Sequence, residues 1–331
     1  MDKVEQIKKK ICKNQGNISF DLSNWEKVIS CSAFVPEYYV KSLVDYYATY
    51  LEGTNLSFLI EENNTPIGLF PFIIHEKNEK FFLSVEGQSL LPPLFIDDIP
   101  KKLRKRVEKN IVDTILLVAE ELKVEKIEFA EPNQFLTNWY LYWLERAEKD
   151  FATYQLAINL QKNIEDIRLD FRKSYKPLVN KGIKEWQVEV CNKDYDKTFE
   201  EFKYLHKEVA GKQTRSDETW KIQKEQIINH EAFLVTVRDH DLLIGAGFFN
   251  YSRDVGLYSV GAYKRELSDK PIGHVVQMTA IKKLKDLGCK TYHLGKKALN
   301  GSTEKELSIS HFKEGFAGYV YAEPHIEVFL S

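Results

Sequence analysis

The chain has 331 residues, of which 43% are hydrophobic and 13% aromatic, and its formal net charge is −2. This length exceeds what one compact core usually holds, and the composition is too apolar for a disordered chain. We therefore expect two folded domains, spanning 1–160 and 161–331. The near-neutral charge argues against a general binder of nucleic acid or membrane surfaces, but it leaves room for a local basic groove.

Targeting and metal signals are absent from the sequence. No run approaches the length of an apolar membrane span, and residues 1–14 lack an apolar signal segment, so we expect a cytoplasmic protein with no membrane span. The four cysteines are far apart and include no CxxC pair, which predicts reduced, mostly buried thiols. The eight histidines show no metal-ligand spacing, and we expect no metal site.

The first half starts with helical segments and continues with strands. Two strand-like runs in "LSFLIEENNTPIGLFPFIIH" (56–75) are separated by the turn-forming "ENNTP". A third strand candidate is "KFFLSVEG" (80–87). The spacing of apolar residues in "PKKLRKRVEKNIVDTILLVAEEL" (100–122) predicts an amphipathic helix, and "KIEFAEP" (126–132) a closing strand.

The second half repeats this order. "AFLVTVRDHDLLIGAGFFNYS" (232–252) again reads as strand, polar turn and strand, and "VGLYSVGAY" (255–263) as a third strand. "PIGHVVQMTAIKKLKDLG" (271–288) predicts a helix with proline near its start and glycine at its end, followed by the strand "KTYHLG" (290–295). The recurring order indicates an internal duplication, with two α/β units in tandem.

Two segments concentrate positive charge. The predicted helix carries six cations within 101–109, and "FRKSYKPLVNKGIK" (171–184) holds five cations and no acid. Both patterns are typical of solvated faces or charged linkers. Alternatively, they form a local anion-binding track at a cleft. We expect Pro177 to interrupt any helix through the second segment.

Several segments of the second half resemble the FemAB-like proteins, a family of GNAT-type acyltransferases. These segments are "IRLDFRKSYKPLVNKG" (167–182), "HKEVAGKQTRSDETWKIQ" (206–223), "LYSVGAYKREL" (257–267), "PIGHVVQMTAIKKLKDLG" (271–288) and "ELSISHFKEGFAGY" (306–319). The run around Lys313 is the most specific of them. The first half matches in pattern only.

The resemblance implies an α/β fold of two tandem GNAT-like units, each a mixed sheet flanked by helices. It also implies transfer of an acyl group to an amine. The family's best-known members move amino acids from aminoacyl-tRNA onto peptidoglycan precursors, and relatives acylate amino sugars. The expected partners are therefore a small-molecule amine acceptor, an amino sugar or peptidoglycan precursor, and tRNA. No bound cofactor is expected, because acyl-CoA or aminoacyl-tRNA is the donor co-substrate.

The chain departs from the peptidoglycan enzymes in two ways. It lacks a long charged helical hairpin, and its stretch "AGKQTRSDETW" (210–220) is more similar to the shorter relatives. Neither half contains the glycine-rich loop with which conventional GNAT enzymes bind the pyrophosphate of CoA. A standard acetyl-CoA mode is thus not supported, and a non-catalytic tandem GNAT-like binding protein is the alternative reading.

Lys313 is the first candidate for catalysis. Following the family's lysine at this place, it would stabilise the oxyanion or a donor phosphate. Phe312 would wall the same groove, and Gly315 and Gly318 would let backbone and substrate approach closely. The alternative is a helix that ends in "EGFAG" and packs Phe312 and Phe316 into a core.

The remaining candidates lie in the other matching segments. His206 has the ordinary pKa of a general base, or it is a surface histidine. Arg215 beside Trp220 suits an anion bound by a stacked guanidinium, whereas Ser216 or Asp217 reads as a helix N-cap. The predicted substrate-binding residues are Arg172, Lys173, Lys212, Thr214, Arg215, Trp220, Tyr258, Tyr263, His274 and Phe312. Tyr258, Tyr263 and His274 are equally compatible with ordinary packing.

Overall fold

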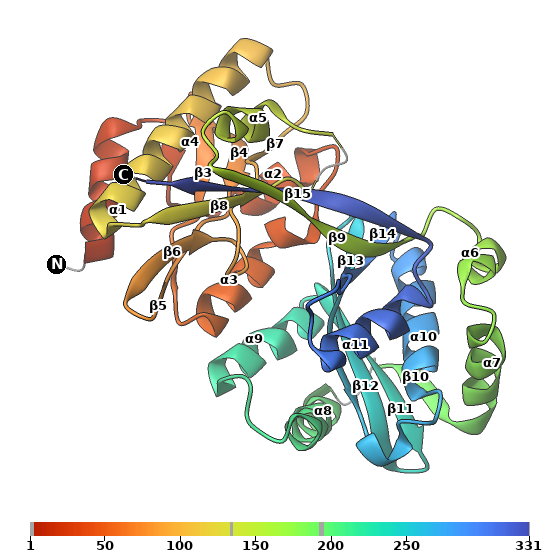
Figure 1. Cartoon of the computed structure of the whole chain (residues 1–331). Coiled ribbons are helices and arrows are strands. Elements are labelled where there is room, and N and C mark those ends of the chain that lie inside the picture. Colours follow the sequence, from red (N-terminus) through yellow and green to blue (C-terminus); the bar gives the residue numbers. More distant parts are fainter. Residues whose placement is uncertain (1–2, 133–134, 192–194, 331) are drawn as a thin grey trace. The chain divides into compact units, whose positions relative to one another are not determined.

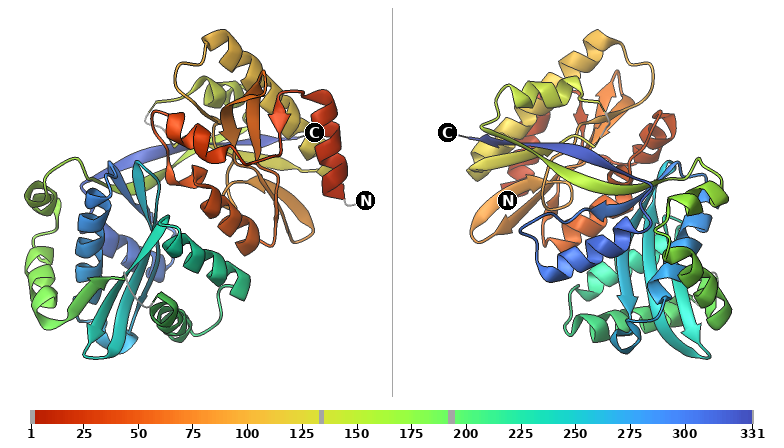
Figure 2. Two further views of the ribbon diagram at one scale, coloured as in Figure 1. Left: turned by 180° about the vertical axis from the view of Figure 1, so that it is seen from behind. Right: turned by 45° about the vertical axis from the view of Figure 1, so that its right-hand side comes forward.

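The structure is a computed structural model that describes residues 3–132, 135–191 and 195–330 (Figures 1 and 2). The chain divides by its internal contacts into unit 1 (Met1–Thr153 and Glu323–Ser331) and unit 2 (Tyr154–Ala322). Strands β9 (Lys149–Asn159) and β15 (Tyr319–Phe329) contribute residues to both units. The contribution of the last residues to unit 1 has no counterpart in the sequence analysis, and the boundary after residue 160 stays a prediction.

Unit 1 contains two small antiparallel sheets, ordered β1-β3-β4-β7 and β2-β5-β6, and a pairing of β8 with the end of β15. The long helix predicted at 100–122 is present as α4. The helices are α1 (Lys3–Asn14), α2 (Trp25–Cys31), α3 (Lys41–Tyr50), α4 (Lys101–Leu122) and α5 (Asn138–Leu144), and the 3₁₀ turn η1 is Glu37–Tyr39. The strands are β1 (Ile18–Ser19), β2 (Thr54–Asn55), β3 (Phe58–Glu62), β4 (Thr65–Phe70), β5 (Ile73–Lys77), β6 (Lys80–Ser84), β7 (Leu94–Phe95) and β8 (Lys126–Ala130).

Alternation along the strands of unit 1 separates two cores. Phe58 and Ile60 of β3 pack with the apolar face of α4, whereas Leu59 between them packs with Trp25 and Val28 of α2. Successive strand residues point to opposite faces, so the continuous apolar run "FLI" covers both sides of the sheet. The third strand candidate of this half does not join the sheet of β3 and β4; it pairs with β5.

Unit 2 is built on a mixed sheet in the order β10-β11-β12-β13-β14-β9. All pairs are antiparallel except β13 with β14, which the crossover helix α10 joins. The strands are β10 (Gln187–Val190), β11 (Ala232–Asp239), β12 (Leu242–Tyr251), β13 (Val255–Tyr263) and β14 (Thr291–Lys296). The helices are α6 (Ile164–Asp170), α7 (Tyr175–Glu185), α8 (Tyr195–Ala210), α9 (Asp217–Ile228), α10 (Ile272–Asp286) and α11 (Glu304–Glu314), and the 3₁₀ turn η2 is Arg265–Leu267.

Helices cover both faces of the unit 2 sheet. On one face Val235 and Val237 of β11 pack with α10, and on the other Leu234 packs with α8 and α9. Figures 1 and 2 show α10 and α8 on opposite sides of β12. As predicted, Pro271 caps the start of α10 and Gly288, with φ +86°, follows its end.

The sheet of unit 2 opens between β13 and β14. The two strands pair in parallel only where Val255–Leu257 lies beside Thr291–His293, although β13 continues to Tyr263. The remaining half of β13 faces the start of α10, and the space beside it is the cavity described below. This local separation of two parallel strands therefore positions the candidate site.

Two local predictions are wrong. Helix α7 includes Pro177, because the proline occupies the first turn, where its missing N–H would have no partner within the helix. The thiols are not mostly buried: Cys289 is buried, but Cys12 and Cys31 are exposed. In the described part of the chain, no helix combines the length and the apolarity that crossing a membrane requires.

Candidate active site

A cavity of about 830 Å³ lies in unit 2 between the open half of β13, the start of α10 and the exposed face of α11. Its volume is in the range of pockets that bind small molecules. The predicted residues His206, Tyr258, Tyr263, His274, Phe312 and Lys313 all line it. Segments far apart in the sequence thus converge on one space.

The side chains that line this cavity carry more positive than negative charge, although Lys264 and Lys270 each pair with a neighbouring acid, Glu266 and Asp269. Five cations line it, and none of the described residues that line it is Asp or Glu. The lining cations are Lys264, Arg265, Lys270, Lys305 and Lys313. Because cations gathered in a concave site attract anions, the cavity suits a ligand with negative charge.

Lys313 is the most strongly perturbed cation of the site. Burial lowers the pKa of its ammonium group to about 8. Its Nζ atom lies 5.5 Å from the centre of the Tyr258 ring, and among the described residues no carboxylate forms an ion pair with it. An ammonium group that is partly desolvated and lacks a counterion is suited to meet negative charge on a ligand.

Gly295 on β14 provides the space for this amine. A Cβ atom built on Gly295 would lie 3.0 Å from Nζ of Lys313, and the glycine has φ +98°. Only glycine adopts this backbone readily. The helix that carries Lys313 begins with a capping box, in which the side chains of Thr303 and Glu306 satisfy each other's backbone N–H groups.

The glycines after Lys313 serve packing. A Cβ atom on Gly315 would lie 2.1 Å from the ring of Tyr175, so the ring occupies the space that we had expected a substrate to use. Phe316 is fully buried in the same cluster, and Phe312 packs partly against it. The packing alternative for "EGFAG" is therefore correct for Phe316, while Phe312 also lines the cavity.

Arg172 braces the end of α11. Its backbone N–H donates to the Gly315 carbonyl at 2.8 Å, and Nη2 donates to the carbonyl of His311 at 3.0 Å. It also donates to the hydroxyl of Tyr175 at 3.2 Å. Arg172 does not line the cavity, and neither does Lys173, which is exposed. The structure therefore does not bring these two predicted residues to the site.

Tyr258 and Tyr263 form a hydroxyl pair on β13, 2.8 Å apart. Burial raises the pKa of Tyr258 to about 12 and raises that of Tyr263 well above its ordinary value. Both phenols are therefore neutral at physiological pH and act as hydrogen-bonding groups. The backbone of Gly261 lies close beside this pair, since a Cβ there would meet the Tyr258 hydroxyl at 2.0 Å.

His274, in the first turn of α10, is a neutral imidazole. Burial, with a contribution from Arg172, lowers its pKa to about 4. Its ring lies edge-to-face on Tyr175 at 4.4 Å and on Phe312 at 5.2 Å. Both ring nitrogens are buried and have no hydrogen-bond partner among the described residues. A polar ring left unsatisfied at the wall of a cavity is a candidate contact for a ligand.

His206 accepts a hydrogen bond from Arg215, whose Nη1 lies 3.1 Å from Nε2. Burial and then the charge of Arg215 lower the pKa of His206 to about 4. The imidazole is thus a weak base at neutral pH, and this geometry gives little support to a general-base role. The guanidinium of Arg215 lies 5.1 Å from the centre of the Trp220 ring, which is the stacking that the sequence suggested.

A second, smaller cavity of about 230 Å³ adjoins the first at His206. Lys212, Thr214 and Trp220 line it. Ser216 is the N-cap of α9 and accepts from the N–H of Thr219 at 3.2 Å, so the alternative reading of that serine is correct. The segment 206–220 therefore combines helix capping with the wall of two adjoining cavities.

Sequence reasoning missed three lysines of the large cavity, Lys264, Lys270 and Lys305, together with Gly295. The lysines follow β13 or begin α11 and carry no spacing signal of their own. The charged loop 264–270 between a predicted strand and a predicted helix was the available hint, because loops at strand ends carry many binding residues. Gly295 lacks such a hint, since its role depends on where Lys313 lies.

No family model and no curated protein sequence matches the chain. Its structure, however, is similar to several solved structures. FemX aligns with a TM-score of 0.64 and 13% identity over 90% of this chain and 97% of FemX. L-PGS from Bacillus licheniformis aligns with a TM-score of 0.61 and 11% identity, over 93% of this chain and 92% of L-PGS. The C-terminal domain of a putative lysylphosphatidylglycerol synthetase from Agrobacterium fabrum aligns with a TM-score of 0.58 and 7% identity, over 91% of this chain and 90% of that domain.

These likenesses extend over nearly the whole chain and show its fold. The chain has the FemAB-like, GNAT-type α/β fold that the resemblance predicted, and it divides into two units. The mixed sheet that we expected in each unit is present in unit 2, whereas the two small sheets of unit 1 are antiparallel. Identities this low establish the fold alone. What the protein does must therefore be argued from the residues of its cavities.

Proposed function

We propose that the protein is an N-acyltransferase that moves an acyl or aminoacyl group to the amine of an amino sugar or cell-envelope precursor. The observation that carries this proposal is Lys313, a desolvated lysine without a carboxylate partner in a cation-lined cavity. One protein of the same fold is named as a putative lysylphosphatidylglycerol synthetase, which agrees with aminoacyl transfer in the cell envelope.

The residues suit the steps of such a transfer. The nitrogen of the acceptor amine attacks the carbonyl carbon of the donor, and the carbonyl oxygen becomes an oxyanion. The oxyanion collapses, the bond from carbon to the donor's oxygen or sulfur breaks, and the amine proton passes to the leaving group. Lys313 would stabilise the oxyanion, and the neutral hydroxyls of Tyr258 and Tyr263 would orient the reacting groups.

The donor is a substrate and not a resident cofactor. Acyl-CoA and aminoacyl-tRNA both carry phosphates, and Lys264, Lys270 and Lys305 in the cavity wall would attract either. His274 offers two unsatisfied nitrogens to the same ligand. Since the glycine-rich phosphate loop is missing, side-chain cations would replace backbone N–H groups in holding the phosphates.

The test combines donor binding with a transfer assay. Thermal unfolding of the wild type and of Lys313→Ala is measured with acetyl-CoA, a long-chain acyl-CoA and a charged-tRNA mimic. A donor at about 100 times its Kd stabilises the protein by about 2.7 kcal/mol. Mass spectrometry then detects amide formation on glucosamine and on a peptidoglycan precursor.

Stabilisation by one donor, with amide formation that Lys313→Ala abolishes, would support the transferase. Stabilisation by a CoA thioester would identify a thioester donor, and stabilisation by the tRNA mimic alone would identify aminoacyl transfer. Binding without amide formation on either acceptor would favour the non-catalytic binding protein. No shift with any donor would contradict the proposal.

A further inference from the structure

A groove in unit 1 is lined by side chains that have no role in the proposed acyl transfer, which takes place in the cavity of unit 2. It lies along α4 and α5, has a volume of about 920 Å³ and is lined from Lys101 to Glu145. The two helices lie side by side in Figures 1 and 2. One wall of the groove is basic and the other is apolar, so the groove is amphipathic.

The basic wall is a row of lysines on one face of α4. Lys101, Lys105 and Lys109 are spaced four residues apart, which places them on one side of the helix over about 12 Å. All three are exposed, and no carboxylate among the described residues forms an ion pair with any of them. The two acids of the groove have other partners: Glu108 pairs with Arg104 at 2.9 Å and Glu145 with Arg146 at 3.8 Å.

The apolar wall is unusually exposed. Leu136 and Leu141 line the groove with exposed fractions of 46% and 41%, and the adjacent Phe135 is 82% exposed. Large apolar side chains gathered beside a row of cations indicate a surface that meets another apolar phase.

A buried donor at the groove also lacks a partner. Trp139 lines the groove and is 2% exposed, and its Nε1–H finds no acceptor among the described residues. The same is true of Trp143 Nε1, which does not line the groove, so the indole N–H belongs to the aromatic core beneath the groove. The preference for a ligand with anionic oxygens therefore comes from the lysine row alone.

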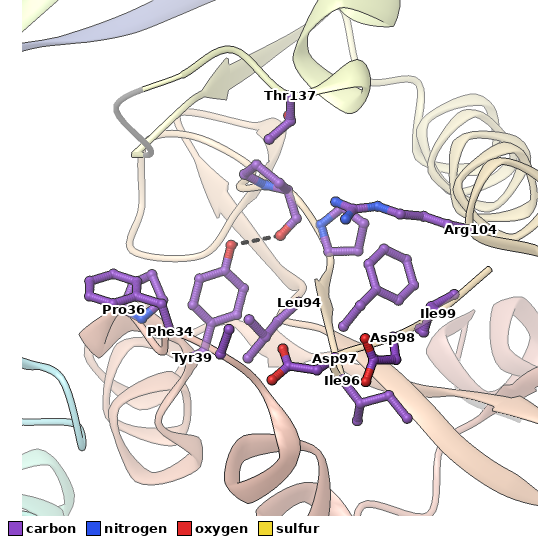
Figure 3. A pocket seen from close by; sticks show the side chains of 14 residues that line it. Phe34, Pro36, Tyr39, Leu94, Ile96, Asp97, Asp98, Ile99, Arg104 and Thr137 are labelled. Atoms are coloured by element: carbon purple, nitrogen blue, oxygen red, sulfur yellow. Dashed lines mark hydrogen bonds between the residues drawn. The ribbon is translucent and has the colours of Figure 1, made fainter. Parts of the chain in front are cut away.

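A neighbouring cavity in unit 1 differs from the groove in the charge of its wall. It has about 430 Å³, shares Arg104 and Thr137 with the groove, and is lined by Asp97 and Asp98 (Figure 3). Its Tyr39 hydroxyl donates to the carbonyl of Pro92 at 2.7 Å. Asp97 and Asp98 make that cavity less suited to an anion than the groove, whose two acids each pair with an arginine.

We propose that the groove of α4 and α5 binds the surface of a membrane that contains anionic phospholipids. The phosphate oxygens lie against Lys101, Lys105 and Lys109, and Phe135, Leu136 and Leu141 enter the boundary with the acyl chains. A bilayer is the occupant that we propose because its surface presents anionic oxygens directly beside an apolar phase, which matches the row of lysines beside exposed apolar side chains. Binding through this groove would hold the protein at the membrane surface without a membrane-spanning helix. The proposal does not depend on the proposed acyl transfer.

The test is cosedimentation of the full chain with lipid vesicles. We expect it to pellet with vesicles of phosphatidylcholine that contain a third phosphatidylglycerol, but not with pure phosphatidylcholine, and to be released by high salt. Lys101→Glu/Lys105→Glu/Lys109→Glu should weaken binding at least about a hundredfold, since each lysine contributes several-fold near an anionic surface. Phe135→Ser/Leu141→Ser should weaken it about tenfold or more.

The matched control is Lys181→Glu/Lys184→Glu/Lys282→Glu, which makes the same change in formal charge on exposed lysines of unit 2. It should bind vesicles nearly as the wild type does. Melting temperatures of all variants establish that they are folded.

Three results would overturn the proposal. The first is a wild type that binds neither kind of vesicle, or both equally. The second is full binding by the groove charge variant or by Phe135→Ser/Leu141→Ser, because adsorption would then not use this groove or its apolar wall. The third is thermal stabilisation by inorganic phosphate, lost in the charge variant, without vesicle binding. That result would assign the lysines to a free anion.

Discussion

The ammonium nitrogen of Lys313 lies 5.5 Å from the centre of the Tyr258 ring, so the last helix of unit 2 contacts the half of β13 that does not pair with β14. The electron-rich face of an aromatic ring attracts a cation only weakly. This attraction does not compensate for the hydration that the ammonium group loses on burial, so the pKa of Lys313 falls to about 8. The amine is therefore held where a ligand's negative charge would stabilise its protonated form.

Replacing Lys313 by Met should abolish transfer without unfolding the protein. The loss of one well-placed oxyanion donor typically lowers kcat by about 10²- to 10³-fold. Lys313→Arg keeps the charge but not the shape and should retain part of the activity. The measurement is kcat with the donor and acceptor that the binding and transfer assays identify. A Met variant with wild-type kcat would remove Lys313 from the mechanism.

Protonation of Lys313 should also make stability depend on pH. The unfolded chain binds this proton with the ordinary pKa of 10.5 and the folded chain with about 8. Between these values the unfolded state holds more protons, so the free energy of unfolding should rise with pH, by at most about 1.4 kcal/mol per unit. Urea unfolding from pH 7.5 to 10 measures it, and Lys313→Met should flatten this part of the curve. Equal slopes in both proteins would show that the lysine is not desolvated.

Gly295→Ala tests whether the position of the amine matters. Gly295 and Gly301 have nearly the same φ, +98° and +99°, which L side chains rarely adopt, so alanine should destabilise the protein at either position by roughly 1 to 3 kcal/mol. Only at Gly295 would the new methyl group meet Nζ of Lys313, at 3.0 Å. Transfer should thus fall at least about tenfold in Gly295→Ala and much less in Gly301→Ala. Similar activities of the two variants would contradict this placement of Lys313.

His206 should remain neutral down to about pH 5. Burial and the charge of Arg215 lower its pKa to about 4, so removing that charge with Arg215→Met should raise the pKa toward its ordinary value, with burial limiting the rise. An NMR titration of the imidazole in both proteins measures the change. If the pKa of His206 is near 6.5 in the wild type, the hydrogen bond from Arg215 is not formed and the general-base role becomes tenable.

His325 should stabilise unit 1 most in acid. Burial alone would lower its pKa, but hydrogen bonds to Glu128 at 3.0 Å and Glu323 at 2.9 Å outweigh it and raise the pKa. The contribution is therefore complete below the ordinary value of 6.5 and is lost as pH rises through the folded pKa.

Urea unfolding between pH 5 and 8 measures this loss, which His325→Asn should remove. A wild type whose stability does not fall over this interval would show that the imidazole is not charged between the two carboxylates.

Local sequence patterns predicted much of the secondary structure. The helix at 100–122, the strand–turn–strand runs of both halves and the helix at 271–288 are present because each has an apolar periodicity and turn or cap residues of its own. Pro177 was misjudged because the same residue breaks a helix interior and is tolerated in a first turn. Only the position of the helix start distinguishes the two cases.

The fold and several residues that line the candidate cavity could thus be predicted from the chain alone, because periodicity, caps and a family resemblance are local properties. The arrangement of the candidate site depends on tertiary packing. It brought the lysines 264, 270, 305 and 313 into one cavity, placed Gly295 beneath an amine, and turned Arg172 into a brace for α11. Burial, and with it a pKa near 8 for Lys313, depends on distances between elements far apart in sequence, and no local pattern specifies those distances.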